Sequence, residues 1–172
     1  MLKVLTSVAA IMVATAAGAA EKDKMATAQL KDPSGKQVGT ATFTEKKKGV
    51  EIKVDVSSLP PGKHGIHLHE KGVCEPPGFK SAGDHYNPFN KSHGAKNPQG
   101  KHTGDLPNLE VKQDGTGKMT ATAEGATLGK GTGSLLQQGG TALIIHAGPD
   151  DEKSDPAGKS GDRIACGVVT GK

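Results

Sequence analysis

Short segments of alternating apolar and polar residues, separated by turn-forming residues, constrain the fold of this chain more than any other feature. Alternation with a period of two is typical of β-strands that bury one face, and glycine, proline, asparagine and aspartate between such segments indicate turns. Eight segments of this kind occur, and none has the helical period of about 3.6 residues. They are residues 26–31, 38–44, 50–56, 65–70, 108–112, 118–123, 141–146 and 163–169.

The composition agrees with a many-stranded fold. The 172 residues include 25 glycines and 10 prolines but no tryptophan, which suits frequent turns better than long helices. We therefore predict an all-β domain, an eight-stranded antiparallel Greek-key sandwich or flattened barrel. We also predict two long functional loops, the first after residue 70 and the second over residues 147–162.

The first 20 residues have the layout of a signal peptide. Lys3 precedes an apolar segment over residues 4–17, and small residues follow before the charged Glu21. A membrane-spanning helix would need about 20 apolar residues, more than this segment has. We expect residues 1–20 to be removed and residues 21–172 to form one exported domain, periplasmic or secreted and not bound to a membrane.

The charge of the chain gives no reason to expect a nucleic-acid partner. The formal net charge falls from +4 to +3 when residues 1–20 are removed, because Lys3 is the only charged residue among them. A balance this close to neutral is too weak an electrostatic signal for binding a phosphate backbone. We therefore predict no nucleic-acid binding.

Histidines are concentrated in one part of the chain, since six of the seven lie between residues 64 and 105. His67 and His69 are two residues apart on an expected strand, so both imidazoles face the same side and can reach one metal ion. His64 is an odd number of residues from both, and we expect it to face away and to bind no metal. The long aperiodic stretch that follows carries further side chains of types that zinc accepts. These are His85, His93, His102 and Asp105.

At these histidines the sequence resembles a known family. The segments GIHLHE, GDHYNP, KSHG and KHTGDL, with LIIHAGPDD and GDRIACGV further along, are similar to the copper/zinc superoxide dismutase family in its secreted bacterial form. The similarity extends from about Ala26 to Val169. It implies an enzyme that converts superoxide into oxygen and hydrogen peroxide at a redox-cycling copper beside a structural zinc.

The resemblance also implies two ligand sets that share one residue. Copper would be bound by His67, His69, His85 and His146. Zinc would be bound by His85, His93, His102 and Asp105. His85 would then bridge the two metals as an imidazolate and take part in catalysis by passing a proton.

Two further residues receive roles from the resemblance alone. It implies that the Asp150 carboxylate hydrogen-bonds to ligand histidines of both sites, and that Arg163 docks the superoxide anion beside copper. Without the resemblance, Asp150 is a loop acid and Arg163 a surface residue at the start of a strand.

Cys74 and Cys166 are the two cysteines of the chain. In an exported protein two cysteines normally pair, so we predict a disulfide between them. The alternatives are two free thiols or soft ligands for copper.

Two other functions remain open on the sequence alone. The chain could be an exported metal store without catalysis, although every copper-ligand position and Arg163 are filled. It could be a zinc hydrolase, because His69 is followed by the acid Glu70, but such sites typically lie in longer α/β chains. Monomer and homodimer are both compatible with the sequence.

Overall fold

The computed structural model describes residues 24–172, so the predicted signal peptide, residues 1–20, lies outside the described residues. Within residues 24–172 there are ten β-strands, one short 3-10 turn (Lys80–Ala82) and no α-helix. The strands are β1 (Met25–Lys31), β2 (Gln37–Lys46), β3 (Gly49–Val56), β4 (Gly62–His64), β5 (Ile66–His69), β6 (Leu109–Val111), β7 (Gly117–Glu124), β8 (Ala142–His146), β9 (Arg163–Val168) and β10 (Thr170–Gly171). The same part of the chain has no helix long and apolar enough to cross a lipid bilayer.

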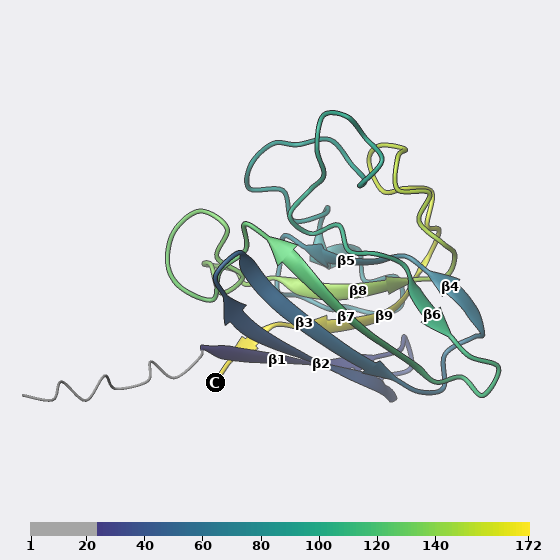
Figure 1. The fold of residues 1–172 in the computed structure, drawn as a ribbon. Helices are drawn as coiled ribbons and strands as arrows, with labels where there is room; N and C mark the ends of the chain where they lie inside the picture. The colour runs from purple at the N-terminus through teal and green to yellow at the C-terminus, as the bar shows by residue number, and fades with distance from the viewer. Residues whose placement is uncertain (1–23) are drawn as a thin grey trace, which may run out of the picture.

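The strands form one antiparallel sheet that curls into a nearly closed barrel (Figure 1). Their order is β4-β6-β7-β3-β2-β1-β9-β8-β5, and β10 pairs with β1. Only Gly65 separates β4 from β5, so the two ends of this order meet in one continuous stretch of chain. The connections from β3 to β4 and from β7 to β8 each pass over intervening strands, which are Greek-key crossings. The predicted fold class is confirmed.

All eight predicted strands form, and β4 and β10 are additional. Each of these two has at most three residues, too few to show alternation in the sequence. β4 also follows directly after Pro60 and Pro61, and prolines between alternating segments indicate a turn, not a strand. Pairing with β6 makes these residues a strand, and that partner lies far away in the sequence.

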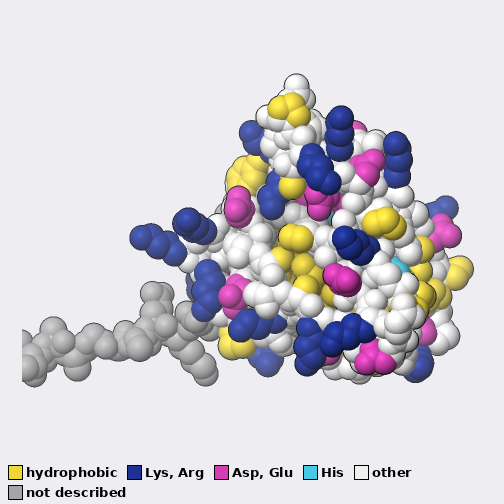
Figure 2. Space-filling view, turned by 45° about the vertical axis from the view of Figure 1, so that its right-hand side comes forward, with side chains coloured by type: hydrophobic (Ala, Val, Ile, Leu, Met, Phe, Trp, Pro, Cys, Tyr) yellow, Lys and Arg dark blue, Asp and Glu magenta, His cyan; other side chains and the backbone are white. Residues whose placement is uncertain are grey.

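The alternating residues build the interior of the barrel. Phe43 of β2 lies opposite Ile52 of β3, and both side chains are fully buried. Their neighbours on the same strands point outward and are polar, such as Thr42 and Lys53. Burial of apolar area contributes about 25 cal/mol per Å² to folding. Charged side chains of both signs are scattered over the face seen in Figure 2.

The two long loops, residues 70–108 and 147–162, lie together on one side of the barrel (Figure 1). The first loop covers the outer face of β8, which is therefore buried on both faces. A small apolar cluster fills this contact, with Phe79, Ala82, Ala142, Ile144 and Cys166 as its buried members. The predicted disulfide between Cys74 and Cys166 is confirmed, with a Cα–Cα distance of 5.7 Å. It fastens the first loop to β9.

Candidate metal centre

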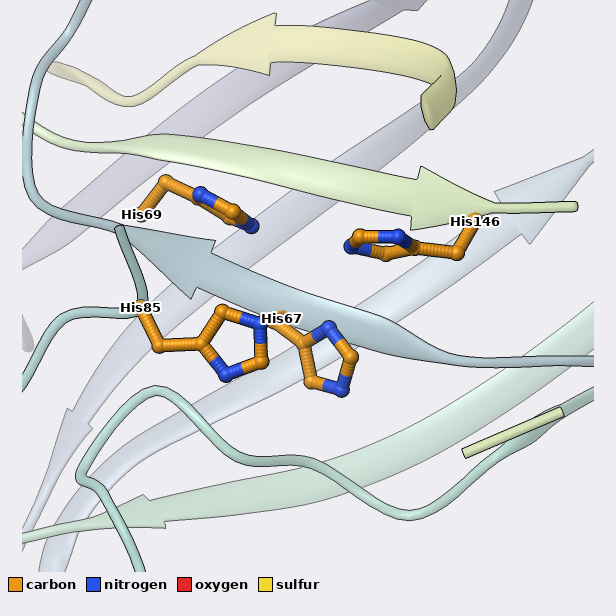
Figure 3. A group of neighbouring side chains, drawn as sticks. All are labelled: His67, His69, His85 and His146. Atoms are coloured by element: carbon orange, nitrogen blue, oxygen red, sulfur yellow. The ribbon is translucent and has the colours of Figure 1, made fainter. Parts of the chain in front are cut away.

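Two neighbouring strands and the first long loop bring four imidazoles together (Figure 3). His67 and His69 share one face of β5, and His146 ends the adjacent strand β8. His85 comes from the loop, which forms an isolated β-bridge to His69. One ligand atom from each of the four rings lies within 4.8 Å of the others.

The orientation of three of these rings is set by one hydrogen bond each. A carbonyl or carboxylate oxygen accepts from one ring nitrogen, so that nitrogen carries the proton and the other has a free lone pair. The bonds join His67 Nε2 to Asp150 Oδ2 (2.7 Å), His69 Nδ1 to the Gly83 carbonyl (2.9 Å) and His146 Nδ1 to the Gly161 carbonyl (3.0 Å). The protein therefore presents these three rings with their lone pairs available.

The remaining ring nitrogens of the group are buried and have no hydrogen-bond partner within residues 24–172. They are His67 Nδ1, His69 Nε2, His85 Nε2 and His146 Nε2. A buried polar atom without a partner is costly, and four of them at one point would be destabilising without a ligand. Imidazole nitrogens in this number suit a copper ion.

Burial keeps these rings neutral. Desolvation lowers the pKa of His67 to about 3, of His69 to about 2 and of His146 to about 4. Repulsion by the neighbouring His85 ring contributes to these low pKa values. At neutral pH the lone pairs are therefore free of protons and can bind a metal.

A second group is centred on one carboxylate oxygen. Three Nδ1 atoms approach Asp105 Oδ1, from His85 at 2.8 Å, His93 at 3.1 Å and His102 at 3.2 Å. Zinc binds its ligand atoms at about 2.0–2.1 Å, so two ligand atoms of a tetrahedral site lie roughly 3.3 Å apart. The three Nδ1–Oδ1 distances are close to this value. The other oxygen, Oδ2, accepts from the Gly94 and His102 amides and so fixes the carboxylate. Three imidazoles and a carboxylate fit zinc.

His85 belongs to both groups. Its Nδ1 faces Asp105 in the second group, and its Nε2 is the unpaired atom in the first. The ring thus lies between the two places where metals fit.

Asp150 connects the two groups through their rings. It accepts from His67 Nε2 and, at 3.0 Å, from His93 Nε2. Burial would raise the pKa of Asp150, but the hydrogen bonds from these two rings hold it well below its usual range. Asn108 in turn accepts from the Asp150 amide at 2.7 Å and donates to its carbonyl at 2.9 Å. No motif or spacing in the sequence indicates this role for Asn108.

His93 differs from the other rings in its proton affinity. Burial lowers its pKa, but the nearby carboxylates of Asp105 and Asp150 outweigh this and raise the pKa to about 10. Without a metal, this ring is therefore a cation at neutral pH.

His64 is buried but belongs to neither group. Its Nδ1 lies 2.8 Å from the His146 carbonyl and its Nε2 lies 2.8 Å from the Pro60 carbonyl. Both nitrogens are occupied by the backbone, in agreement with the expectation that His64 binds no metal.

Arg163 lies close to the first group. It begins β9 opposite His146, and its guanidinium donates to the carbonyls of Phe79 and Gly83, each at 2.8 Å. The open pocket beside it has a volume of about 730 Å³. The pocket is lined by Pro33, Pro77, Gly78, Lys80, Gly83, Asp84, Gly161, Asp162, Arg163 and Ile164. The pocket thus holds two cations, Lys80 and the Arg163 guanidinium fixed by two carbonyls, and two acids, Asp84 and Asp162.

Comparisons with known proteins agree with this geometry. The family described as "Copper/zinc superoxide dismutase (SODC)" matches residues 37–169. Superoxide dismutase (Cu-Zn) 1 of Aquifex aeolicus (strain VF5) is 49% identical over 144 residues, which cover 83% of this chain and 85% of that protein. Superoxide dismutase (Cu-Zn) of Escherichia coli (strain K12) is 36% identical, over 95% of this chain and 96% of that protein.

A solved structure supports the same assignment. The crystal structure of a SOD-like protein from Bacillus subtilis has a TM-score of 0.80 and 42% identity, and the match covers 84% of this chain and 97% of that one. The fold, the two groups of ligands and the sequence relatives lead to one conclusion. The chain belongs to the copper/zinc superoxide dismutase family, oxidoreductases that use copper and zinc to convert superoxide into oxygen and hydrogen peroxide.

Proposed function

We propose that the two groups of side chains divide the metals between them. The all-imidazole group holds copper through His67, His69, His85 and His146, and the carboxylate-containing group holds zinc through His85, His93, His102 and Asp105. The observation that carries this assignment is the convergence of four buried imidazole nitrogens without hydrogen-bond partners in the described chain. When bound, copper supplies one-electron redox chemistry, which zinc lacks.

We infer that His85 bridges the two metals as an imidazolate. Its two nitrogens belong to different groups, so both can bind a metal only after both have lost their protons. Release of the ring on the copper side would let Nε2 take up a proton and later give it to the reduced substrate. His85 thereby holds one of the two protons that hydrogen peroxide needs.

Arg163 supplies the charge that attracts the substrate. Superoxide is a small anion, and two carbonyls hold the guanidinium beside the pocket that reaches Gly83 and Gly161. These two glycines also accept from the rings of His69 and His146. The arginine thus shares one backbone acceptor, the Gly83 carbonyl, with the proposed copper ligand His69.

Metal analysis of single variants tests the division of ligands. We expect one copper and one zinc per wild-type chain. His93→Ala should lose zinc and keep copper, whereas His146→Ala should lose copper and keep zinc. If His93→Ala lost copper while zinc stayed bound, the assignment would be wrong. A dismutation assay on the same samples distinguishes the enzyme from a metal store.

The disulfide indicates an oxidising compartment, extracellular or periplasmic. We propose that residues 1–20 direct export and are removed, which leaves residues 21–172 as the mature domain. Amino-terminal sequencing of protein from the periplasmic or extracellular fraction tests this proposal. The oligomeric state, monomer or homodimer, would be decided by sedimentation equilibrium at several concentrations.

A further inference from the structure

Phe79 combines two features that are rarely found together. Its backbone has φ 52° and ψ 25°, a left-handed conformation that side chains other than those of glycine, asparagine and aspartate seldom adopt. Its ring is nevertheless almost completely buried, with 2% exposed. The residue stands directly before the 3-10 turn Lys80–Ala82, and Gly83 stands directly after it.

The two residues that flank this turn hold the guanidinium of Arg163. Nη1 donates to the Phe79 carbonyl and Nη2 donates to the Gly83 carbonyl, each at 2.8 Å. The planar fork of an arginine is thus bound at two points by one short piece of backbone. Movement of the turn would move the charge.

The ring of Phe79 fixes the turn to the barrel. It packs in the small cluster with Ala82, Ile144 and Cys166, beneath the first long loop. Ile144 belongs to β8 and Cys166 to β9, so the cluster that contains the ring includes residues of two strands of the sheet. The turn therefore has an apolar attachment close to one of its two contacts with Arg163.

We propose that Phe79 is a positioning residue for Arg163. Its buried ring holds the turn in place, and its left-handed backbone directs the carbonyl to the guanidinium. The charge is thereby kept at one point beside the copper group. The consequence for catalysis rests on the proposed role of Arg163 in docking the anion, but the contact itself does not.

The contact can be measured without copper. In the zinc-loaded, copper-free protein, nitrogen-15 NMR of arginine side chains should show slow rotation of the Arg163 guanidinium, because both Nη groups are hydrogen-bonded. We expect Phe79→Gly, which permits the left-handed backbone but removes the ring, to make this rotation fast. Fast rotation in the wild-type protein would overturn the proposal without any variant.

Anion affinity shows whether the contact matters for the site. Azide serves as the probe anion for the copper- and zinc-loaded protein, and its dissociation constant is read from absorbance. We expect Phe79→Gly to weaken azide binding about tenfold, the size of one lost hydrogen bond to a charged group. Phe79→Leu keeps an apolar side chain and should restore most of the affinity. Phe89→Gly is the matched control, because Phe89 lies in the same loop but is 44% exposed.

A double-mutant cycle separates positioning from general loosening. If Phe79 acts through Arg163, then Phe79→Gly should change azide affinity less than about twofold when Arg163→Lys is already present. An equal loss in both backgrounds would contradict the proposal. If Arg163→Lys alone left azide affinity unchanged, the anion-docking role would fail, while the NMR result on Phe79→Gly would still test the contact.

Discussion

Oδ2 of Asp150 lies 2.7 Å from Nε2 of His67, so a residue of the second long loop fixes the orientation of a ring on β5. Its other oxygen accepts from His93 and also from the Glu152 amide. One carboxylate therefore orients a proposed copper ligand and a proposed zinc ligand.

Asp150→Asn should weaken the binding of both metals. An amide lacks the charge that orients the His67 and His93 rings, and losses of this kind typically reduce metal affinity roughly 10- to 100-fold. Competition with chelators measures both affinities. Asp151→Asn is the control, because the bonds that the Asp151 carboxylate makes within residues 24–172 all lie in its own loop, to Lys153, Ser154 and Lys159. Equal losses in both variants would contradict a specific role for Asp150.

Zinc binding to the metal-free protein should release about one proton at pH 7. The pKa of His93 is about 10 without metal, so its ring must lose a proton before it can bind zinc. Adding copper to the zinc-loaded protein should then release a further proton, from Nε2 of His85, if that ring bridges the metals. Calorimetry in buffers of different ionisation enthalpy counts the protons released in the zinc step and in the copper step. A copper step without proton release would rule out the bridge.

The metal-free protein should lose stability as the pH falls below 6.5. The pKa values of His67, His69 and His146 are about 3, 2 and 4, below the value of 6.5 in an unfolded chain. Because the folded pKa values are lower, the unfolded chain binds protons first, and stability present above pH 6.5 is lost as the pH falls toward 4. Three groups lose at most about 4 kcal/mol per pH unit.

Denaturation of the metal-free protein at a series of pH values measures this loss. His146→Gln should give a shallower slope between pH 6.5 and 4. The lowered pKa values of Asp105 and Asp150 act only below about 3.8, so these carboxylates do not affect that window. His93 has the opposite sign, and the stability it provides is lost as the pH rises from 6.5 through about 10. An unchanged slope in His146→Gln would contradict the burial argument.

Reduction of the disulfide should lower the melting temperature. Cys74 and Cys166 are 92 residues apart, and closing a loop of that length contributes roughly 4–5 kcal/mol in the chain-entropy view. Thiol titration of the unfolded, unreduced protein should find essentially no free thiol. The double variant Cys74→Ser/Cys166→Ser should match the reduced protein. A melting temperature unaffected by reduction would mean that the bond does not contribute to stability.

Arg163→Glu should reduce the rate of superoxide consumption strongly while both metals stay bound. Electrostatic steering, for which superoxide dismutases are a standard example, raises encounter rates roughly 10- to 1,000-fold and weakens with salt. Arg163→Lys keeps the charge but not the planar fork, so an intermediate rate is expected. Pulse radiolysis across a salt series measures the rate of superoxide consumption by the wild-type protein and by both variants. Equal rates for the arginine and glutamate forms would show that Arg163 does not attract the substrate.

The local pattern of the sequence determined the strands and much of the site. Period-two alternation predicts the eight longer strands, because each buries one face against the same interior. The spacing of His67 and His69 places both rings on one side of a strand, and family resemblance supplied His146, Asp150, Arg163 and the shared role of His85. The pairing of Cys74 with Cys166 followed from there being two cysteines in an exported chain.

Only the tertiary structure decided how the loops hold these side chains. The loop residues 70–108 and 147–162 have no periodicity, so their backbone positions depend on contacts with residues far away in the sequence. Asn108 reaches Asp150 across 42 positions, and Phe79 reaches Arg163 across 84. β4 is a strand only because β6 lies beside it. Local sequence cannot predict such partners, because each contact exists only after the barrel has closed.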